Sequence, residues 1–311
     1  MVSEMIRVLY LYDREGWALH NVGLLWADLL EDSHHFEFCR LGAHRALKPW
    51  NYNYVLFGCT LMTERHLRIK SLLSRFGFYS DPWLPDRNRN FVSVVHDPCE
   101  VFSESPDWKS APPFMRRLFH YKRLAVISNE MQGILSRHGI HCSKINTTSL
   151  FPLRPTDEIS QAPLSVISRA NPIARKNIGM FHRIKAQSIG AVDRFDGYFD
   201  WRVIPTADYQ RLLDSYNCYL CTSWQEGGPL PLIDAIHRGC AVLTTPVGQT
   251  DEWVKHGENG FFCTTEQEFL ERIRWFATHP KSLLAFRRRS LEIAARDIRR
   301  TIHQQLFDFL G

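Results

Sequence analysis

Short apolar runs alternate along most of the chain with stretches that carry apolar residues at helical spacing. The runs predict buried strands, which we place at residues 6–12, 35–41, 52–59, 91–95, 124–127, 145–149, 164–167, 218–223 and 241–245. The helical spacing predicts helices at residues 18–30, 64–76, 129–138, 178–188, 208–215, about 230–238, 267–279 and 282–310. Strands that alternate with helices indicate an α/β protein whose parallel sheets carry helices on both faces.

Residues 153–163 interrupt this alternation, because they contain proline and show no apolar period. A chain of 311 residues is long enough for two hydrophobic cores. We therefore expect two doubly wound, Rossmann-like domains, at residues 1–153 and 154–290. Residues 291–311 are expected to form a C-terminal helix.

The composition is that of an ordinary globular protein, with 44% hydrophobic and 23% charged residues. A formal net charge of +5 suits an acidic partner such as a nucleotide diphosphate, an anionic membrane face or a phosphorylated glycolipid. The charge is too small and too dispersed to indicate a nucleic-acid partner. The sequence contains no run of roughly 18 apolar residues and no signal-peptide pattern at its start, so we expect a cytoplasmic protein.

Metal ligands are not evident. The eight cysteines lie mostly within apolar runs, which is typical of reduced core thiols. Cys218 and Cys221 have the spacing of half a zinc site, but no second pair follows, and residues three apart on a strand face opposite sides. No Asp-x-Asp pair occurs in the chain either. We expect neither a metal ion nor an organic cofactor.

The stretch after the predicted strand 218–223 carries the strongest chemical signal. A turn with a carboxylate and two small residues, Glu226-Gly-Gly-Pro229, leads into a predicted helix that ends at Gly239. A turn that joins the carboxyl end of a parallel strand to a helix amino terminus is a common site for phosphate-bearing ligands. Glu226 and Asp234 bracket the turn as acceptors for hydroxyl groups. The combination suits a sugar joined to a nucleotide diphosphate.

Residues 222–262 resemble the donor-binding half of glycosyltransferase family four. The shared pattern is carried in order by Glu226, Gly228-Pro229, Asp234, Gly239–Val242, Gly248-Gln249 and Glu252–Gly260. Two positions depart from it, since Asp234 stands where Glu is commoner and Gly248-Gln249 replaces a Gly-Gly turn. The resemblance implies the GT-B fold, in which two Rossmann-like domains face each other across a cleft. It also implies that the terminal stretch 291–311 crosses back to the first domain.

The departing diphosphate of such an enzyme needs cations beside it. The resemblance assigns this role to Arg169 and Lys176, with Arg175 as a rival of Lys176 because the spacing is longer than usual. The alternative is a solvated basic turn with no ligand.

The resemblance also assigns the donor contacts of the second domain. Glu226 would bind sugar hydroxyls, and Asp234 would accept from both ribose hydroxyls. The remaining donor-binding positions are Ser223, the turn residues Gly227, Gly228, Pro229 and Leu230, and Ile204, which lies in a segment that meets the nucleotide base. The alternative for Glu226 is a structural cap on the helix amino terminus.

Two features of the first half complete the prediction. His96 follows the predicted strand 91–95 and would hydrogen-bond a hydroxyl of the donor sugar, although a structural role is an equal alternative. Residues 112–123 interleave aromatic and basic side chains, and this pattern fits either an ordinary helix with a basic edge or a peripheral contact with an anionic membrane at the inner membrane face.

Together these observations predict a metal-independent, retaining glycosyltransferase. It would move a sugar from a nucleotide diphosphate-sugar donor to a hydroxyl of a glycan or lipid-linked acceptor, as polysaccharide or lipopolysaccharide biosynthesis requires. A nucleotide-sugar epimerase or a phosphorylase of the same fold is one alternative. A non-catalytic subunit that binds sugar nucleotides is another.

Overall fold

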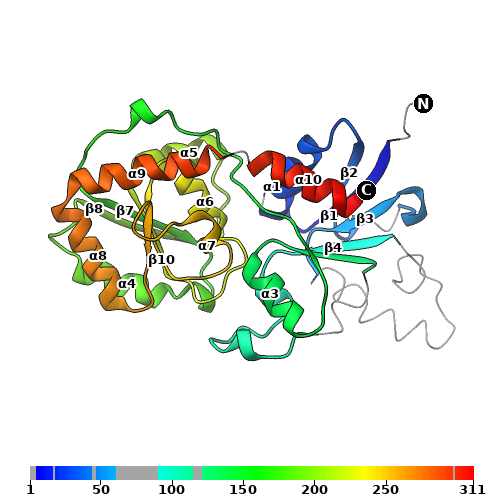
Figure 1. Ribbon diagram of the computed structural model, residues 1–311, viewed down its shortest axis with the longest axis horizontal. Coiled ribbons are helices and arrows are strands. Elements are labelled where there is room, and N and C mark those ends of the chain that lie inside the picture. Colours follow the sequence, from blue (N-terminus) through cyan, green and yellow to red (C-terminus); the bar gives the residue numbers. More distant parts are fainter. Residues whose placement is uncertain (1–4, 17, 44–46, 61–89, 115–120, 297) are drawn as a thin grey trace. The chain divides into compact units, whose positions relative to one another are not determined.

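The computed structural model describes residues 5–16, 18–43, 47–60, 90–114, 121–296 and 298–311 (Figure 1). The chain divides into two compact units. The first contains residues 1–147 together with 298–311, and the second contains residues 148–297. The predicted helix 64–76 lies outside the described residues.

The first unit is built on a six-stranded parallel sheet with the order β2-β1-β3-β4-β5-β6. Its strands are β1 (Ile6–Tyr12), β2 (His34–Arg40), β3 (Tyr54–Phe57), β4 (Phe91–Val95), β5 (Arg123–Val126) and β6 (Ser143–Lys144). Its helices are α1 (Ala18–Leu29), α3 (Asn129–Arg137) and α10 (Ile298–Leu310). β1 and β4 form because they are largely apolar, and the sheet buries residues 8–11 of β1 and all of β4.

The last helix of the chain, α10, packs against α1 in the first unit (Figure 1). The Oε1 atom of Gln305 accepts from the Asn146 main-chain N–H at 2.8 Å, and Arg123 donates to the Phe309 carbonyl oxygen at 2.5 Å. The expectation of a single helix at residues 291–311 was wrong. In the structure α9 (Pro280–Ala294) continues to residue 294 within the second unit, and α10 begins at residue 298. The boundary between the second unit and the C-terminal part of the first unit therefore lies between residues 297 and 298, rather than between residues 290 and 291 as expected.

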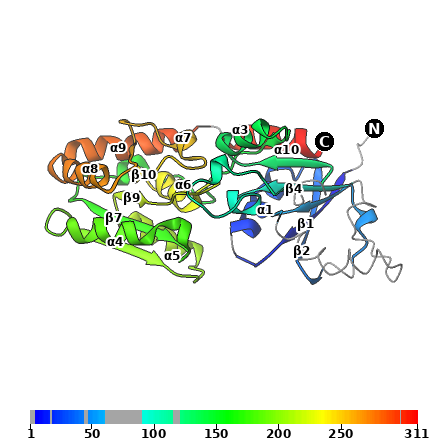
Figure 2. The same cartoon turned by 90° about the horizontal axis from the view of Figure 1, so that it is seen from below.

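The second unit contains a five-stranded parallel sheet with the order β11-β10-β9-β7-β8. Its strands are β7 (Ser165–Ala170), β8 (Arg194–Phe199), β9 (Cys218–Cys221), β10 (Ala241–Thr244) and β11 (Gly260–Phe262). Its other helices are α4 (Ile178–Gln187), α5 (Thr206–Asp214), α6 (Leu230–His237), α7 (Thr250–Trp253) and α8 (Glu266–Thr278). Figure 2 shows β7, β9 and β10 between helices on either side.

The largest hydrophobic core of the second unit joins its sheet to α4, α8 and α9. Apolar side chains of β7, β9 and β10 meet Phe181 and Ile184 of α4, Phe269 and Phe276 of α8, and Phe286 of α9. This burial fixes the sheet and leaves the segments at the carboxyl ends of its strands to carry chemistry.

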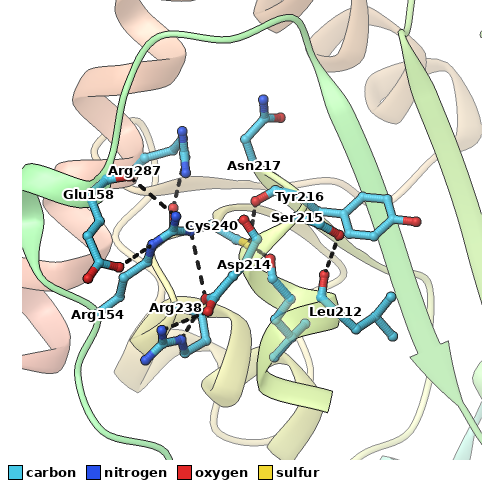
Figure 3. Close-up of polar contacts among 12 residues, drawn as sticks. Arg154, Glu158, Leu212, Asp214, Ser215, Tyr216, Asn217, Arg238, Cys240 and Arg287 are labelled. Carbon is cyan, nitrogen blue, oxygen red and sulfur yellow. Dashed lines mark hydrogen bonds and ion pairs between the residues drawn. The ribbon is translucent and has the colours of Figure 1, made fainter. Parts of the chain in front are cut away.

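Residues 153–163 belong to the second unit, so the boundary lies at residues 147 and 148 rather than at the expected 153 and 154. Three arginines attach this segment to the unit (Figure 3). Arg238 forms a two-pronged ion pair with Asp214, at 2.7 and 2.9 Å, and donates to the Pro152 carbonyl oxygen at 2.7 Å. Arg154 donates to the Asp214 carbonyl oxygen at 3.0 Å, and Arg287 donates to that of Ser160 at 2.9 Å.

No helix of the described residues is long and apolar enough to cross a bilayer. Residues 115–120 of the basic aromatic segment 112–123 lie outside the described residues, and its last residue, Arg123, begins β5.

Candidate functional site

The order of the second sheet defines where a ligand can approach. The chain passes from β7 to β8 on one side of β7 and then returns to place β9 on its other side. The segments that follow β7 and β9 therefore diverge at one edge of the sheet, at the carboxyl ends of both strands. Open α/β sheets bind ligands at such a switch point. Here it is formed by residues 171–177 and 222–229.

Three charged side chains meet at this switch point. Lys176 Nζ lies 2.5 Å from Glu226 Oε1, and Arg175 Nη1 lies 3.6 Å from Glu226 Oε2. Ser223 Oγ donates to Glu226 Oε1 at 2.7 Å. The structure thus brings four predicted site residues into one buried cluster. Two cations around one carboxylate leave an excess of positive charge, which suits an anionic ligand.

The Glu226 carboxyl group is ionised at neutral pH. Its side chain is only 6% exposed, and burial by itself would raise its pKa. The positive charges of Lys176 and Arg175, with hydrogen bonds from Lys176 and Ser223, outweigh burial and hold the pKa of Glu226 below its ordinary value. Glu226 is therefore an acceptor at this site and holds no proton to donate.

Arg175 and Lys176 are neighbours in sequence but have different surroundings. Arg175 Nη1 donates to the Gln225 carbonyl oxygen at 3.0 Å, and the Arg175 carbonyl oxygen accepts from the Trp224 N–H at 2.9 Å. Arg175 therefore ties the two segments of the switch point together. The Lys176 side chain contacts Glu226 and is somewhat more exposed than the Arg175 side chain, at 14% against 9%.

A left-handed residue ends this cationic turn. Residues Ala174–Lys176 form a short 3₁₀ turn, and Asn177 follows with φ +50° and ψ +46° before α4 begins. Asn177 is the only non-glycine residue of the described chain with a positive φ. Asparagine tolerates this conformation better than most residues.

Gly248 packs directly against the main chain of the glycine turn after β9. A Cβ atom at Gly248 would lie 2.2 Å from the Gly227 carbonyl oxygen, and its φ is +55°. The Gln249 N–H donates to the same oxygen at 2.9 Å. Gly248 was part of the sequence pattern, but its role as the support of the turn required the structure.

The turn itself presents main-chain donors. The Leu230 N–H donates to the Gly228 carbonyl oxygen at 2.8 Å, and Pro229 has no N–H group and precedes α6. Within the described residues, the N–H groups of Gly227 and Gly228 have no hydrogen-bond acceptor. Buried N–H groups in native proteins are nearly always satisfied, so these two are available to a ligand.

Asp234 lies one turn into α6, on the side that meets residues 148–152. Its Oδ1 atom accepts from Ser149 Oγ at 2.5 Å. Burial raises the pKa of Asp234 to about 7, although the hydrogen bond from Ser149 acts in the opposite direction. The sequence analysis did not identify Ser149 as a site residue, because a single serine beside a predicted linker belongs to no recognisable motif.

We expect Asp234→Asn to stabilise the protein in a pH-dependent way. The folded-state pKa of about 7 exceeds the ordinary 3.8, so the native state binds more protons than the unfolded chain between these values. Wild-type stability therefore falls as pH rises from about 4 to 7, and asparagine removes this loss. Since Asp234 is partly exposed, we expect the variant to gain about 1–3 kcal/mol at about pH 8 and much less near pH 4.

Denaturant unfolding of both proteins across this pH range measures the difference. If the difference in unfolding free energy between Asp234→Asn and the wild type is the same at every pH, the pKa of Asp234 is not raised in the folded protein.

Arg169 makes contacts away from the Glu226 cluster. Its Nη2 atom donates to the Arg202 carbonyl oxygen at 2.7 Å, and its guanidinium lies over the Tyr209 ring at 5.4 Å. Asp200 is 4.0 Å from Arg169 Nη1. Arg169 thus joins the end of β7 to the loop after β8, which also contains Ile204.

In the first unit, His96 directly follows β4. Its ring stacks on Trp26, with centroids 5.7 Å apart, and burial lowers its pKa to about 4. The imidazole is therefore neutral at physiological pH. The His96 main-chain N–H donates to Glu100 Oε1 at 2.8 Å, and Thr60 donates to Glu100 Oε2 from its N–H at 2.8 Å and from its hydroxyl at 2.9 Å. Sequence reasoning missed Glu100, which organises the loop that carries His96.

The described residues contain no group of three or more His, Cys, Asp or Glu side chains arranged to hold a metal ion. All eight cysteines are free thiols, and four of them, Cys218, Cys221, Cys240 and Cys263, are buried.

Known proteins resemble this chain in the sequence of residues 202–292 and in the fold. Residues 202–292 match the family described as Glycosyl transferases group 1. No curated protein sequence matches the chain significantly. Among solved structures, HepE of Anabaena, in complex with UDP and glucose, is 16% identical with a TM-score of 0.65, and the match covers 98% of this chain and 99% of that one.

Two further structures are similar. Sucrose-phosphate synthase of Thermosynechococcus elongatus is 13% identical with a TM-score of 0.68, over 98% of this chain and 100% of that one. The pneumococcal O-GlcNAc transferase GtfA, in complex with UDP and GlcNAc, is 15% identical with a TM-score of 0.62, over 87% of this chain and 59% of that one. These likenesses confirm the predicted fold class. Residues 202–292 thus match the group 1 glycosyl transferase family, and the chain is a glycosyltransferase of the GT-B fold.

Proposed function

We propose that the enzyme transfers a sugar, with retention of configuration, from a UDP-sugar to a hydroxyl of a glycan or lipid-linked acceptor. The observation that carries the proposal is the buried cluster of Lys176, Arg175 and Glu226 beside the two free N–H groups of Gly227 and Gly228. HepE and GtfA, whose folds are similar, have been crystallised with UDP. This supports uridine as the base of the donor.

Lys176 is the proposed partner of the leaving diphosphate. Negative charge grows on the phosphate oxygens as the bond to the sugar breaks, and a preorganised cation stabilises that charge most strongly in a site shielded from water. Lys176 is held near the turn by Glu226 at 2.5 Å, so its ammonium group is in place before the donor arrives. Arg175 adds a second positive charge while it fixes the main chain of the turn.

The turn and its carboxylate would bind the rest of the diphosphate-sugar. The N–H groups of Gly227 and Gly228, at the positive end of α6, can donate to phosphate oxygens. Glu226 is ionised and can accept from sugar hydroxyls with the lone pairs that Lys176 and Ser223 leave unused. Pro229 and Leu230 hold this turn against the start of α6.

Asp234 and the loop after β8 would hold the nucleoside. The ionised Asp234 carboxylate accepts hydrogen bonds from the ribose hydroxyls, and the main chain at Ile204 meets the base. Arg169 anchors this loop through the Arg202 carbonyl oxygen, so we assign it a positioning role for the base in addition to its electrostatic effect on the diphosphate. His96 is the first unit's candidate for a hydrogen bond to the donor sugar, in its neutral form.

The acceptor proton needs no separate base in this scheme. In retaining transferases of this type the departing phosphate is thought to take the proton of the attacking hydroxyl. The acceptor is proposed to be a glycan or a lipid-linked saccharide in the cytoplasm or at the inner membrane face.

Product analysis separates this function from its alternatives. The purified enzyme is incubated with UDP-glucose, UDP-galactose, UDP-GlcNAc and GDP-mannose, with and without a mixture of glycan and lipid-linked acceptors. A transferase releases nucleotide diphosphate fastest with an acceptor and links the sugar to it. A phosphorylase requires inorganic phosphate, an epimerase changes the sugar without acceptor, and a non-catalytic subunit binds without turnover.

We expect transfer to persist in excess EDTA. The chain has no Asp-x-Asp pair, and Lys176 with Arg175 can neutralise the leaving diphosphate in place of a divalent ion. The initial rate with and without EDTA, in enzyme freed of metal beforehand, measures this. Complete loss of activity that manganese or magnesium restores would contradict the role given to Lys176.

A further inference from the structure

Ser149 is fixed in place on both sides of its hydroxyl. Its Oγ accepts from the Phe151 N–H at 3.0 Å and donates to Asp234 Oδ1 at 2.5 Å. The residue is 5% exposed. Because a hydroxyl has one proton, the direction of the donated hydrogen bond is set by the main chain of residue 151.

The segment around Ser149 is itself anchored to the second unit. The Phe151 ring packs edge-on against Tyr209 of α5 at 5.5 Å, and the Arg154 N–H donates to the His237 carbonyl oxygen at 3.0 Å. Thr148 Oγ1 lies 3.3 Å from His237 Nε2. Ser149 therefore has a fixed position relative to α6, the helix that carries Asp234.

Asp234 has one carboxylate oxygen engaged and one available. Oδ1 receives the Ser149 proton, whereas Oδ2 accepts no hydrogen bond from the residues that the structure describes. An aspartate side chain is one methylene shorter than the glutamate that is commoner at this position, so its carboxylate stays close to α6. A hydroxyl from the segment 148–152 can reach it there.

We infer that Ser149 is a positioning residue for the donor ribose, because its hydroxyl orients the Asp234 carboxylate so that Oδ2 faces the ribose hydroxyls. This inference rests on the proposed function and assigns Ser149 no contact with the reacting atoms.

The same hydrogen bond also affects the ionisation of Asp234. Burial raises its pKa to about 7, and the hydrogen bond from Ser149 is the one contact that lowers it. The titratable groups in the neighbourhood of Asp234 do not supply a compensating charge. Burial keeps Tyr209 neutral by raising its pKa and keeps His237 neutral by lowering its pKa, while the Arg238 guanidinium is paired with Asp214.

Ser149→Ala should therefore change donor binding and its pH dependence together. Only the ionised carboxylate accepts from both ribose hydroxyls, so affinity rises as pH increases through the pKa of Asp234. Without the Ser149 hydroxyl the pKa of Asp234 rises further. The pH at which donor affinity is half-maximal, the midpoint of the affinity profile, therefore moves to a higher value. A hydrogen bond to a charged group also strengthens the ribose contact, so we expect affinity to fall about tenfold near pH 7.

Calorimetric titration with UDP-glucose from about pH 5.5 to 9 tests this. UDP-glucose is the suitable probe because its terminal phosphate is esterified and lacks the proton with a pKa near 6 that free UDP carries. The variants are Ser149→Ala, Ser149→Thr, which keeps the hydroxyl, and Asp234→Asn, which cannot ionise. Ser160→Ala is the matched control, since Ser160 is an exposed serine of the same segment whose carbonyl oxygen, rather than its hydroxyl, makes the contact with Arg287.

The expected result is weaker binding and a raised midpoint for Ser149→Ala, wild-type behaviour for Ser149→Thr and Ser160→Ala, and a flat profile for Asp234→Asn. The turnover of Ser149→Ala at saturating donor should equal that of the wild type, because ribose contacts change little in the transition state. If the wild type binds UDP-glucose and Ser149→Ala has the same affinity and midpoint, the inference fails and the proposed function stands. If the folded wild type binds no UDP-sugar, both fail.

Discussion

Replacing Lys176 with alanine is expected to lower the turnover of sugar transfer by about 10²–10³-fold, because a single preorganised charge donor is typically worth that much in rate. The ammonium group of Lys176 contacts Glu226 at 2.5 Å and is the more exposed of the two cations in the cluster. Its removal leaves the main-chain bonds between the two segments of the switch point intact. The variant should therefore remain folded, and steady-state kinetics can be read directly.

Arg175→Ala should behave differently from Lys176→Ala. The Arg175 guanidinium donates to the Gln225 carbonyl oxygen, and alanine removes this buried hydrogen bond while the main-chain bond from Trp224 remains. We therefore expect the substitution to lower the melting temperature as well as the rate. Lys281→Ala, at an exposed lysine near the start of α9, is the control for loss of a surface charge. If Lys176→Ala keeps wild-type turnover and Arg175→Ala is folded but inactive, then Arg175 rather than Lys176 contacts the diphosphate.

The second large effect is expected for Glu226→Gln, which should lower kcat about 100-fold without raising the donor KM. The sugar gains positive charge as its bond to phosphate breaks, and an ionised carboxylate at this position stabilises that charge more than a neutral amide does. Glutamine also leaves Lys176 and Arg175 without their counter-charge, so the diphosphate itself should bind at least as well as before. Kinetics against donor concentration separate the two parameters.

The same substitution has a cost in stability. Removal of one partner from a buried ion pair typically destabilises a protein by about 3–5 kcal/mol. Denaturant unfolding should therefore accompany the kinetics, and bound UDP can restore part of the loss by occupying the native state. Full turnover in folded Glu226→Gln would show that Glu226 only supports the turn.

The sequence predicted those elements whose own residues determine them. The bounds of β1 and β4 agree with the predicted runs, because both strands are largely apolar and their central residues are buried. β8 was missed because it is an edge strand with polar and partly exposed residues, paired only with β7. β11 was missed because it has three residues, too few for a period.

The candidate site was predictable to the same extent. The motif around Glu226 lies on one continuous stretch, and the topology of a parallel sheet brings it to the cationic turn after β7. The partners of individual side chains were not predictable, since they join residues far apart in sequence. Ser149 meets Asp234 85 positions away, and Arg169 meets Arg202 33 positions away.

The central claim is that the two segments at the switch point bind the diphosphate-sugar. Amide hydrogen exchange of the whole protein with saturating UDP-glucose tests it most directly, because the free N–H groups of Gly227 and Gly228 should become hydrogen-bonded. We predict slower exchange in peptides that cover residues 174–178 and 222–230, and unchanged exchange in α8. Binding of UDP-glucose with no protection of either segment, or with protection elsewhere in the second unit alone, would contradict the account.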